Sequence, residues 1–115
     1  MQYQEPMLDH GHKRADARHL LLHRLALEKL RQHPELRAPV LELLDRWLAD
    51  VSLRPSHRWL AQWREMLTSW PFDRLAEAVL DQKDGQTLRQ CSPLGPVLSP
   101  RERWAALAKW ERRHQ

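Results

Sequence analysis

The absence of any strand pattern constrains the fold of this 115-residue chain more than any other feature. No stretch alternates apolar and polar side chains, Ile is absent, and Leu, Ala, Arg and Glu are abundant. Strands favour β-branched residues and a period of two, whereas these four residue types are good helix formers. A chain of this length forms one domain. We therefore predict an all-α fold, a compact array of five or six short helices in a single domain.

Prolines and turn residues divide the chain into helical segments. Pro34 and Pro71 end helices, because proline lacks the N–H that a helix interior needs, and Pro39 fits only the first turn of a helix. Ser56 is a plausible N-cap. The predicted helices cover residues 14–32, 35–50, 57–69, 72–82, a short piece ending near Cys91, and residues 100–113. We expect residues 1–13 to form a flexible N-terminal tail and residues 14–115 to form the helical domain.

The start of the last helix is the clearest local signal. Ser99 is followed by Pro100 at the first helical position and by Glu102 three residues after the serine. This spacing predicts a capping box, in which the serine hydroxyl and the glutamate carboxylate each accept a hydrogen bond from the other residue's backbone N–H. The last helix should therefore begin at a fixed place.

The segment around this cap, residues 88–104, reads LRQCSPLGPVLSPRERW. It resembles the C-terminal signature of a group of small bacterial helical proteins, approximately LRQ-S-SP-F-x-G-V-L-T/S-P-x-E-R-W. Cys91, Leu94 and Pro96 depart from that pattern. The resemblance implies a compact helical protein and assigns no activity.

Composition excludes several classes of protein. One cysteine cannot form an intramolecular disulfide or a cysteine-rich zinc site. Met1–Asp9 is polar and acidic, unlike a secretory signal, and no apolar run approaches the ~20 residues of a membrane span. We expect a cytoplasmic protein that does not enter a membrane. The net charge of +4 is concentrated at the two ends of the chain, and fifteen of the nineteen basic residues are Arg, which favours an anionic partner.

Three patterns could carry catalysis or a metal, and none is specific. His19 and His23 share a helix face and could bind a metal, with His10 or His12 as the only near candidate for a third ligand. Arg14 and His19 have a spacing that resembles the active site of HEPN-type ribonucleases, and Cys91 would need a nearby base to act as a nucleophile. We predict no catalytic, cofactor or metal site, and the sequence favours a protein that is not an enzyme without deciding the question.

Tryptophan and arginine supply the candidate binding residues. We expect four of the six Trp to face the core, namely Trp47, Trp59, Trp63 and Trp104. Trp70 and Trp110 are harder to bury, and an exposed Trp would be an anchor for a partner. In residues 88–104, the polar side chains left unexplained by the cap are Arg89, Gln90, Arg101 and Arg103. Arg89 and Arg101 could also hold an anion together near the start of the last helix.

These features favour a non-catalytic protein-interaction module. By analogy of size and type, it could be the antitoxin-like or accessory partner of a toxin–antitoxin or defence gene pair. The alternative is a basic nucleic-acid-binding protein, and a weaker alternative is a HEPN-like ribonuclease that uses Arg14 and His19. A protein partner is expected, nucleic acid is a second option, and the sequence leaves the oligomeric state open.

Overall fold

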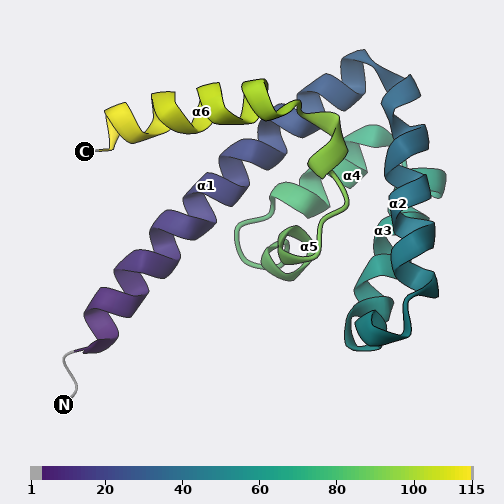
Figure 1. Cartoon of the computed structure of the whole chain (residues 1–115), viewed down its shortest axis with the longest axis horizontal. Coiled ribbons are helices and arrows are strands. Elements are labelled where there is room, and N and C mark those ends of the chain that lie inside the picture. The colour runs from purple at the N-terminus through teal and green to yellow at the C-terminus, as the bar shows by residue number, and fades with distance from the viewer. Residues whose placement is uncertain (1–3, 115) are drawn as a thin grey trace.

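A computed structural model describes the backbone of residues 4–114 and the side chains of residues 14–114. The described residues form six α-helices and no strand, which confirms the all-α prediction (Figure 1). The helices are α1 (Gln4–Gln32), α2 (Arg37–Ala49), α3 (His57–Ser69), α4 (Phe72–Leu80), α5 (Gln86–Gln90) and α6 (Pro100–Arg113). Short 3₁₀ turns connect them at Pro34–Leu36, Val51–Ser56 and Gly95–Val97.

The observed helix bounds match the predicted ones for α3 and α6 and differ from them at the start of the chain. Helices α3 and α6 have the predicted bounds, and Pro39 lies in the first turn of α2 as expected. Helix α1 begins at Gln4, so residues 4–13 are helical where the sequence predicted a tail, and residues 1–3 of that tail lie outside the described residues. The boundary predicted at residue 14 therefore falls within a continuous helix.

Helix α1 is the element on which most of the others pack. Helices α2 and α3 form an antiparallel pair at its C-terminal end, and α4 and α5 contact its middle (Figure 1). Helix α6 runs back along α1 in the opposite direction, because Glu102 at its start pairs with Lys29 and Glu111 near its end pairs with Arg14. The segment between α5 and α6 is thereby held against α1.

The hydrophobic core is formed mainly by side chains from α1 to α5. Its centre is Trp63, which is fully buried and whose indole N–H donates a 2.8 Å hydrogen bond to the backbone oxygen of Leu88. A buried Trp needs such a partner, and here the bond ties α3 to α5. Apolar side chains from all the helices except α6 surround it, among them Leu30, Val40, Leu44, Leu60, Met66, Leu67, Leu75, Val79 and Leu88.

The predicted capping box is present at the start of α6. The backbone N–H of Ser99 donates to Glu102 Oε1 at 2.8 Å, and the Glu102 N–H donates to Ser99 Oγ at 3.1 Å. Lys29 of α1 also donates to Glu102 Oε1, at 2.7 Å. These bonds, the one from Lys29 first, lower the pKa of Glu102 from 4.5 to about 2. One carboxylate thus both caps α6 and joins it to α1.

The N-cap predicted at Ser56 is wrong in its chemistry, although α3 does begin at the next residue. Ser56 makes no side-chain cap bond. Its backbone is already helical, with φ −98° and ψ −3°, because the 3₁₀ turn Val51–Ser56 runs directly into α3. A capping side chain needs the extended backbone that Ser99 has, at φ −70° and ψ 159°.

The charge of Glu102 should make the stability of the protein depend on acid pH. We expect Glu102→Gln to lower the melting temperature at pH 7, since glutamine can still cap the helix but cannot pair with Lys29. The folded pKa lies below the unfolded one, so the stabilisation is present above pH 4.5 and is lost as the pH falls towards 2. The difference between the two proteins should shrink over that range in thermal melts followed by circular dichroism. A difference that is constant with pH would contradict the ion pair.

Candidate functional site

The tryptophan prediction is wrong for the last helix. Trp104, expected in the core, is 73% exposed and is the most exposed large hydrophobic side chain among the described residues. Trp110, expected as an exposed anchor, is buried against α1. The two lie six residues apart, which in an α-helix places them about 120° apart around the axis. Helix α6 therefore cannot turn both towards α1.

The surroundings of Trp110 explain which Trp faces inward. Its indole stacks on the His114 ring, with centroids 4.0 Å apart. The guanidinium groups of Arg14 and Arg18 lie over the indole at 5.2 and 5.4 Å and also pair with Glu111, at 3.5 and 3.0 Å. Cation–π contacts and ion pairs from α1 thus converge on Trp110, and Trp104 is left outside.

The other Trp side chains serve the fold. Trp63 is buried, and Trp47 and Trp59 are partly buried against the core. Trp70, the second predicted anchor, is also partly buried, and the Arg74 guanidinium lies 4.0 Å from the centre of its ring. Trp104 is consequently the exposed Trp of the described chain.

An open groove of about 550 Å³ adjoins Trp104, and we call this region the Trp104 surface. The groove runs between the 3₁₀ turn Gly95–Val97 and the first turns of α6. Most of its lining is apolar, with one guanidinium at its edge. The lining residues are Gly95, Pro96, Leu98, Ser99, Pro100, Arg103, Trp104 and Leu107.

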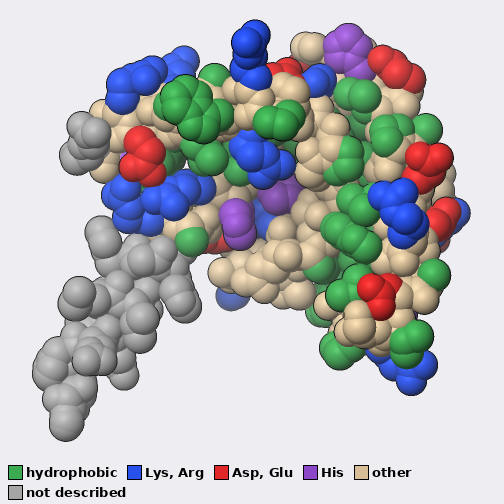
Figure 2. Space-filling model, in the orientation of Figure 1, with side chains coloured by type: hydrophobic (Ala, Val, Ile, Leu, Met, Phe, Trp, Pro, Cys, Tyr) green, Lys and Arg blue, Asp and Glu red, His purple; other side chains and the backbone are tan. Residues whose placement is uncertain are grey.

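The acidic side chains of α6 form ion pairs, whereas its basic side chains form none with the described residues. Both of its carboxylates form ion pairs with α1, Glu102 with Lys29 and Glu111 with Arg14 and Arg18. None of its cations has a carboxylate partner among residues 14–114; they are Arg101, Arg103, Lys109, Arg112 and Arg113. Figure 2 shows Lys and Arg side chains gathered around hydrophobic ones over α6. Exposed cations of α6 such as Arg101 and Arg112 are therefore not balanced by a carboxylate of the described residues.

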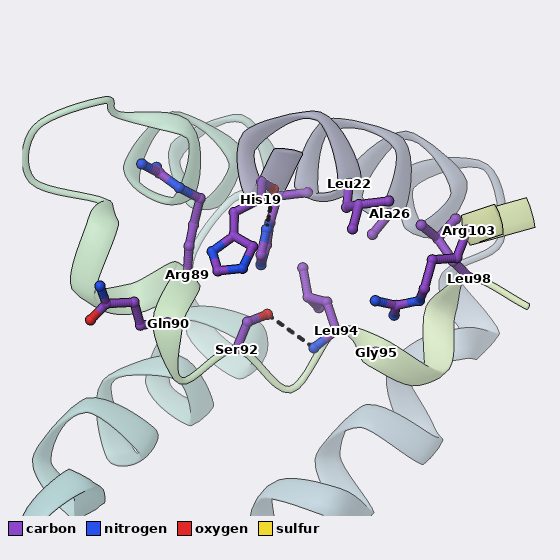
Figure 3. Close-up of a pocket in the computed structure, with 11 residues that line it drawn as sticks. His19, Leu22, Ala26, Arg89, Gln90, Ser92, Leu94, Gly95, Leu98 and Arg103 are labelled. Carbon is purple, nitrogen blue, oxygen red and sulfur yellow. Dashed lines mark hydrogen bonds between the residues drawn. The ribbon is translucent and has the colours of Figure 1, made fainter. Parts of the chain in front are cut away.

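A second, smaller hollow lies between α1 and the α5–α6 connection, and we call it the α1 pocket (Figure 3). Its volume is about 200 Å³. The polar lining comes from His19, His23, Arg89, Gln90, Ser92 and Arg103, and the apolar lining includes Leu22, Ala26, Leu94 and Leu98. Three of the predicted site residues, Arg89, Gln90 and Arg103, thus meet at one place, and Arg101 does not join them.

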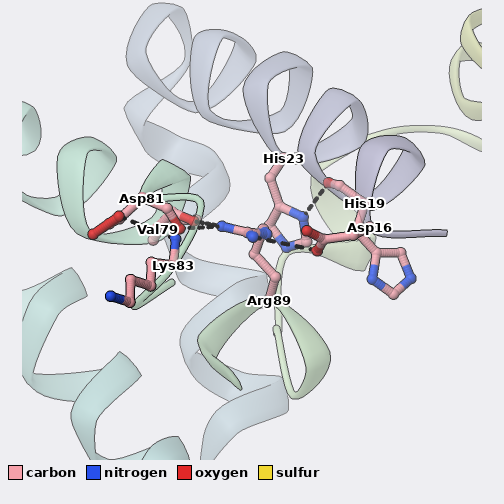
Figure 4. Close-up of polar contacts among 7 residues, drawn as sticks. All are labelled: Asp16, His19, His23, Val79, Asp81, Lys83 and Arg89. Atoms are coloured by element: carbon pink, nitrogen blue, oxygen red, sulfur yellow. Dashed lines mark hydrogen bonds and ion pairs between the residues drawn. The ribbon is translucent and has the colours of Figure 1, made fainter. Parts of the chain in front are cut away.

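Arg89 serves the fold rather than a surface contact. Its side chain is completely buried (Figure 4). Nη1 donates to the backbone oxygens of Val79 and Asp81, at 2.7 and 2.8 Å, and Nη2 lies 3.3 Å from a carboxylate oxygen of Asp16. The guanidinium therefore caps the C-terminal end of α4, where a positive charge is favourable, and it also joins α4 to α1. The prediction that Arg89 contacts a partner is not supported by this position.

The remaining predicted residues occupy different surroundings. Gln90 is exposed at the rim of the α1 pocket. Arg101 is exposed on α6, away from the buried Arg89, so these two side chains do not form the predicted anion site. Arg103 is partly buried and lines both the α1 pocket and the Trp104 surface.

His23 forms part of the buried wall of the α1 pocket. Its Nδ1 lies 2.7 Å from the backbone oxygen of His19, which fixes the proton on Nδ1. Burial is the main cause that lowers the pKa of His23 below 6.5, and Arg89 adds to the effect. The ring is accordingly neutral at pH 7. His19 is exposed, and residues 14–114 contain no group of three side chains that could hold a metal; the side chains of His10 and His12 lie outside the described residues.

The arrangements proposed for catalysis are not assembled by this part of the chain. The Cys91 thiol bonds to the backbone oxygen of Thr87 at 3.3 Å, and burial raises its pKa, which disfavours the thiolate. His57 bonds to the backbone at the end of α2, and Arg14 is held by Glu111. Arg14 does not line the α1 pocket with His19.

Comparison with known proteins adds no assignment: no protein-family model, curated protein or solved structure matches the chain. The signature predicted for residues 88–104 stays a prediction. Within the described residues, no helix has the length and apolar character needed to cross a membrane.

The sequence predicted Trp104 in the core and His19 and His23 as a metal pair, so it did not place Trp104 beside a groove or the two histidines in the lining of a pocket. A usable signal was present in the charges: Arg14 and Arg18 lie four apart on α1, as a pair that one carboxylate of another helix can join. Matching them to Glu111, and Lys29 to Glu102, fixes the rotation of α6 and turns Trp104 outward.

Arg89 should be critical for stability. We expect Arg89→Leu to lower the free energy of unfolding by about 3 kcal/mol, because the carbonyls of Val79 and Asp81 and the carboxylate of Asp16 would lose their partner. Arg101→Leu, at an exposed position, should change it by less than about 0.5 kcal/mol. The free energies of unfolding of both variants are measured by urea denaturation. Equal values for the two variants would refute the capping role of Arg89.

Proposed function

We propose that the protein is a non-catalytic interaction module that binds an acidic, amphipathic segment of a partner protein through the Trp104 surface. One observation carries the proposal: Trp104 stands 73% exposed beside an apolar groove, on a helix with exposed cations. The antitoxin-like or accessory partner of a toxin–antitoxin or defence gene pair is one setting for such a module. A ribonuclease is not proposed, since Arg14 and His19 share no cavity.

The exposure of Trp104 supports the proposal through its energetic cost. A large apolar side chain left in water beside other apolar groups marks an interaction site. Trp and Arg are the residues most enriched at the centres of protein interfaces, and Trp104 lies next to Arg103 here. Pro96 and Pro100 line the groove with rigid backbone, so little conformational entropy would be lost there on binding.

The charges define the chemistry of the partner. Arg101 and Arg112 lie three residues before and eight residues after Trp104, so all three share one face of α6. Because Glu102 and Glu111 are engaged by α1, no carboxylate of α6 balances these cations. A segment that combines Asp or Glu with an apolar side chain matches both the charge and the groove.

Nucleic acid is the alternative, favoured by the same cations. Arg side chains beside an exposed Trp could bind phosphates and stack on single-stranded bases. The apolar groove argues for a protein instead, because proline and leucine offer a base neither a stacking face nor a hydrogen bond. Salt dependence separates the two, since binding to many phosphates weakens steeply with added salt.

The proposal predicts that Trp104→Ala strongly weakens binding. The tagged chain is used to capture its partner from the native host, and the captured protein is then purified and titrated against each variant. We expect Trp104→Ala to weaken binding at least about thirtyfold, as for an interface anchor worth 2 kcal/mol or more. The matched control is Val51→Ala, which truncates a hydrophobic side chain that is 67% exposed. Val51 belongs to the 3₁₀ turn Val51–Ser56, and the connection between α2 and α3 lies far from α6 (Figure 1).

Charge reversal tests the chemistry of the partner. Arg101→Glu combined with Arg112→Glu should weaken binding and should do so less at high salt, because the effect is electrostatic. Equal binding by Trp104→Ala and wild-type protein would refute the proposal. Capture of nucleic acid alone, with a steep loss of binding between low and moderate salt, would replace it with the alternative.

A further inference from the structure

We propose that the α1 pocket binds a small organic carboxylate. The proposal goes beyond the interaction described above and does not depend on it. It stands on three features of the pocket: the sign of its charge, the position of Arg103 and the apolar character of its remaining walls.

The lining of the pocket carries positive charge and no carboxylate. Arg89 and Arg103 are its two cations, and no Asp or Glu of residues 14–114 lines it. Asp16 is not among the lining residues; it pairs with Arg89 from α1, beside His19 and His23, on the side of the guanidinium opposite Val79 and Asp81 (Figure 4). Arg89 Nε is buried and has no hydrogen-bond partner among the described residues. Asp16 balances Arg89, so Arg103 is the lining cation that no carboxylate of the described residues balances, and such a cation attracts an anion.

Arg103 is placed to bind that anion. Its guanidinium reaches into the pocket from α6, as Figure 3 shows, and it forms no ion pair or hydrogen bond with residues 14–114. A Cβ at Gly95 would come 3.9 Å from Arg103 Nη2, so the 3₁₀ turn Gly95–Val97 lies close to the guanidinium. Planar guanidinium groups bind carboxylates through two parallel hydrogen bonds.

Further polar side chains line the same pocket. Ser92 Oγ accepts a hydrogen bond from the Leu94 N–H at 3.1 Å, which leaves its own proton available to a ligand. The His19 ring is exposed at the mouth of the pocket. His23 is neutral because burial lowers its pKa, so the permanent charges of the lining are those of the two arginines.

The other walls select an organic anion over a fully hydrated one. Leu22, Ala26, Leu94 and Leu98 form the apolar lining. Inorganic phosphate has no apolar surface to bury there, whereas the chain of a short carboxylic acid does. A volume of about 200 Å³ lies below that of drug-sized ligand sites, which indicates a small ligand.

The test uses three probes of known chemistry on the full chain: hexanoate, hexanamide and inorganic phosphate. Each is titrated while amide chemical shifts are followed by NMR. We expect hexanoate to shift the signals of Leu22, Ser92 and Gly95 and to bind about tenfold more tightly than hexanamide, which has the same apolar chain without the charge. Phosphate should bind more weakly than hexanoate.

Variants assign the charge to Arg103. Arg103→Gln should weaken hexanoate binding about tenfold and leave hexanamide binding unchanged. Arg101→Gln is the matched control on the same helix, and Trp104→Ala separates this site from the Trp104 surface; both should keep the affinity for hexanoate within about twofold of wild type.

Three outcomes would overturn the proposal. They are the absence of hexanoate binding at millimolar concentration, equal affinities for hexanoate and hexanamide, and an unchanged hexanoate affinity in a folded Arg103→Gln variant. Tighter binding of phosphate than of hexanoate would likewise refute an organic ligand. None of these results depends on the partner bound by the Trp104 surface.

Discussion

The fold depends on one buried guanidinium. Arg89 extends from a helix of five residues, α5, to the last carbonyls of α4 and to Asp16 on α1, and it does so without exposure to water. A helix as short as α5 has little stability of its own, so its position must come from tertiary contacts. Arg89 and the bond from Trp63 to Leu88 supply them. The segment that follows, with the α1 pocket and the start of α6, is positioned by these contacts.

Electrostatics then decide which face α6 presents to α1. Lys29 engages Glu102 at one end, and the arginines of α1 engage Glu111 at the other. Individual ion pairs at a surface contribute little stability. Their consequence here is orientation: they bring Trp110 under two guanidinium groups, engage both carboxylates of α6 and leave Trp104 in water. The same contacts that fasten the helix thus create the surface proposed to bind a partner.

The sequence predicts local features of this protein well and the rotation of its helices poorly. The bounds of α3 and α6 and the capping box follow from signals within four residues of one another, such as Ser99, Pro100 and Glu102. Local signals do not predict which face of α6 turns inward, because Trp104 and Trp110 offer similar apolar area. Which Trp is buried depends on Arg14 and Arg18, which lie more than eighty residues away in the sequence. For the same reason Arg89 was predicted as a surface contact: its partners lie on α4 and α1. The meeting of Arg89, Gln90 and Arg103 in one pocket was beyond reach without the fold.

The outward position of Trp104 is the central claim, and acrylamide quenching of tryptophan fluorescence tests it most directly. Wild-type protein and Trp104→Phe are compared under native conditions, with Trp59→Phe as a control that removes a partly buried indole. We predict that Trp104→Phe loses the red-shifted, readily quenched part of the emission and that Trp59→Phe keeps it. An accessible fraction that is the same in Trp104→Phe and in wild-type protein would mean that Trp104 is covered, and the account of α6 would be wrong.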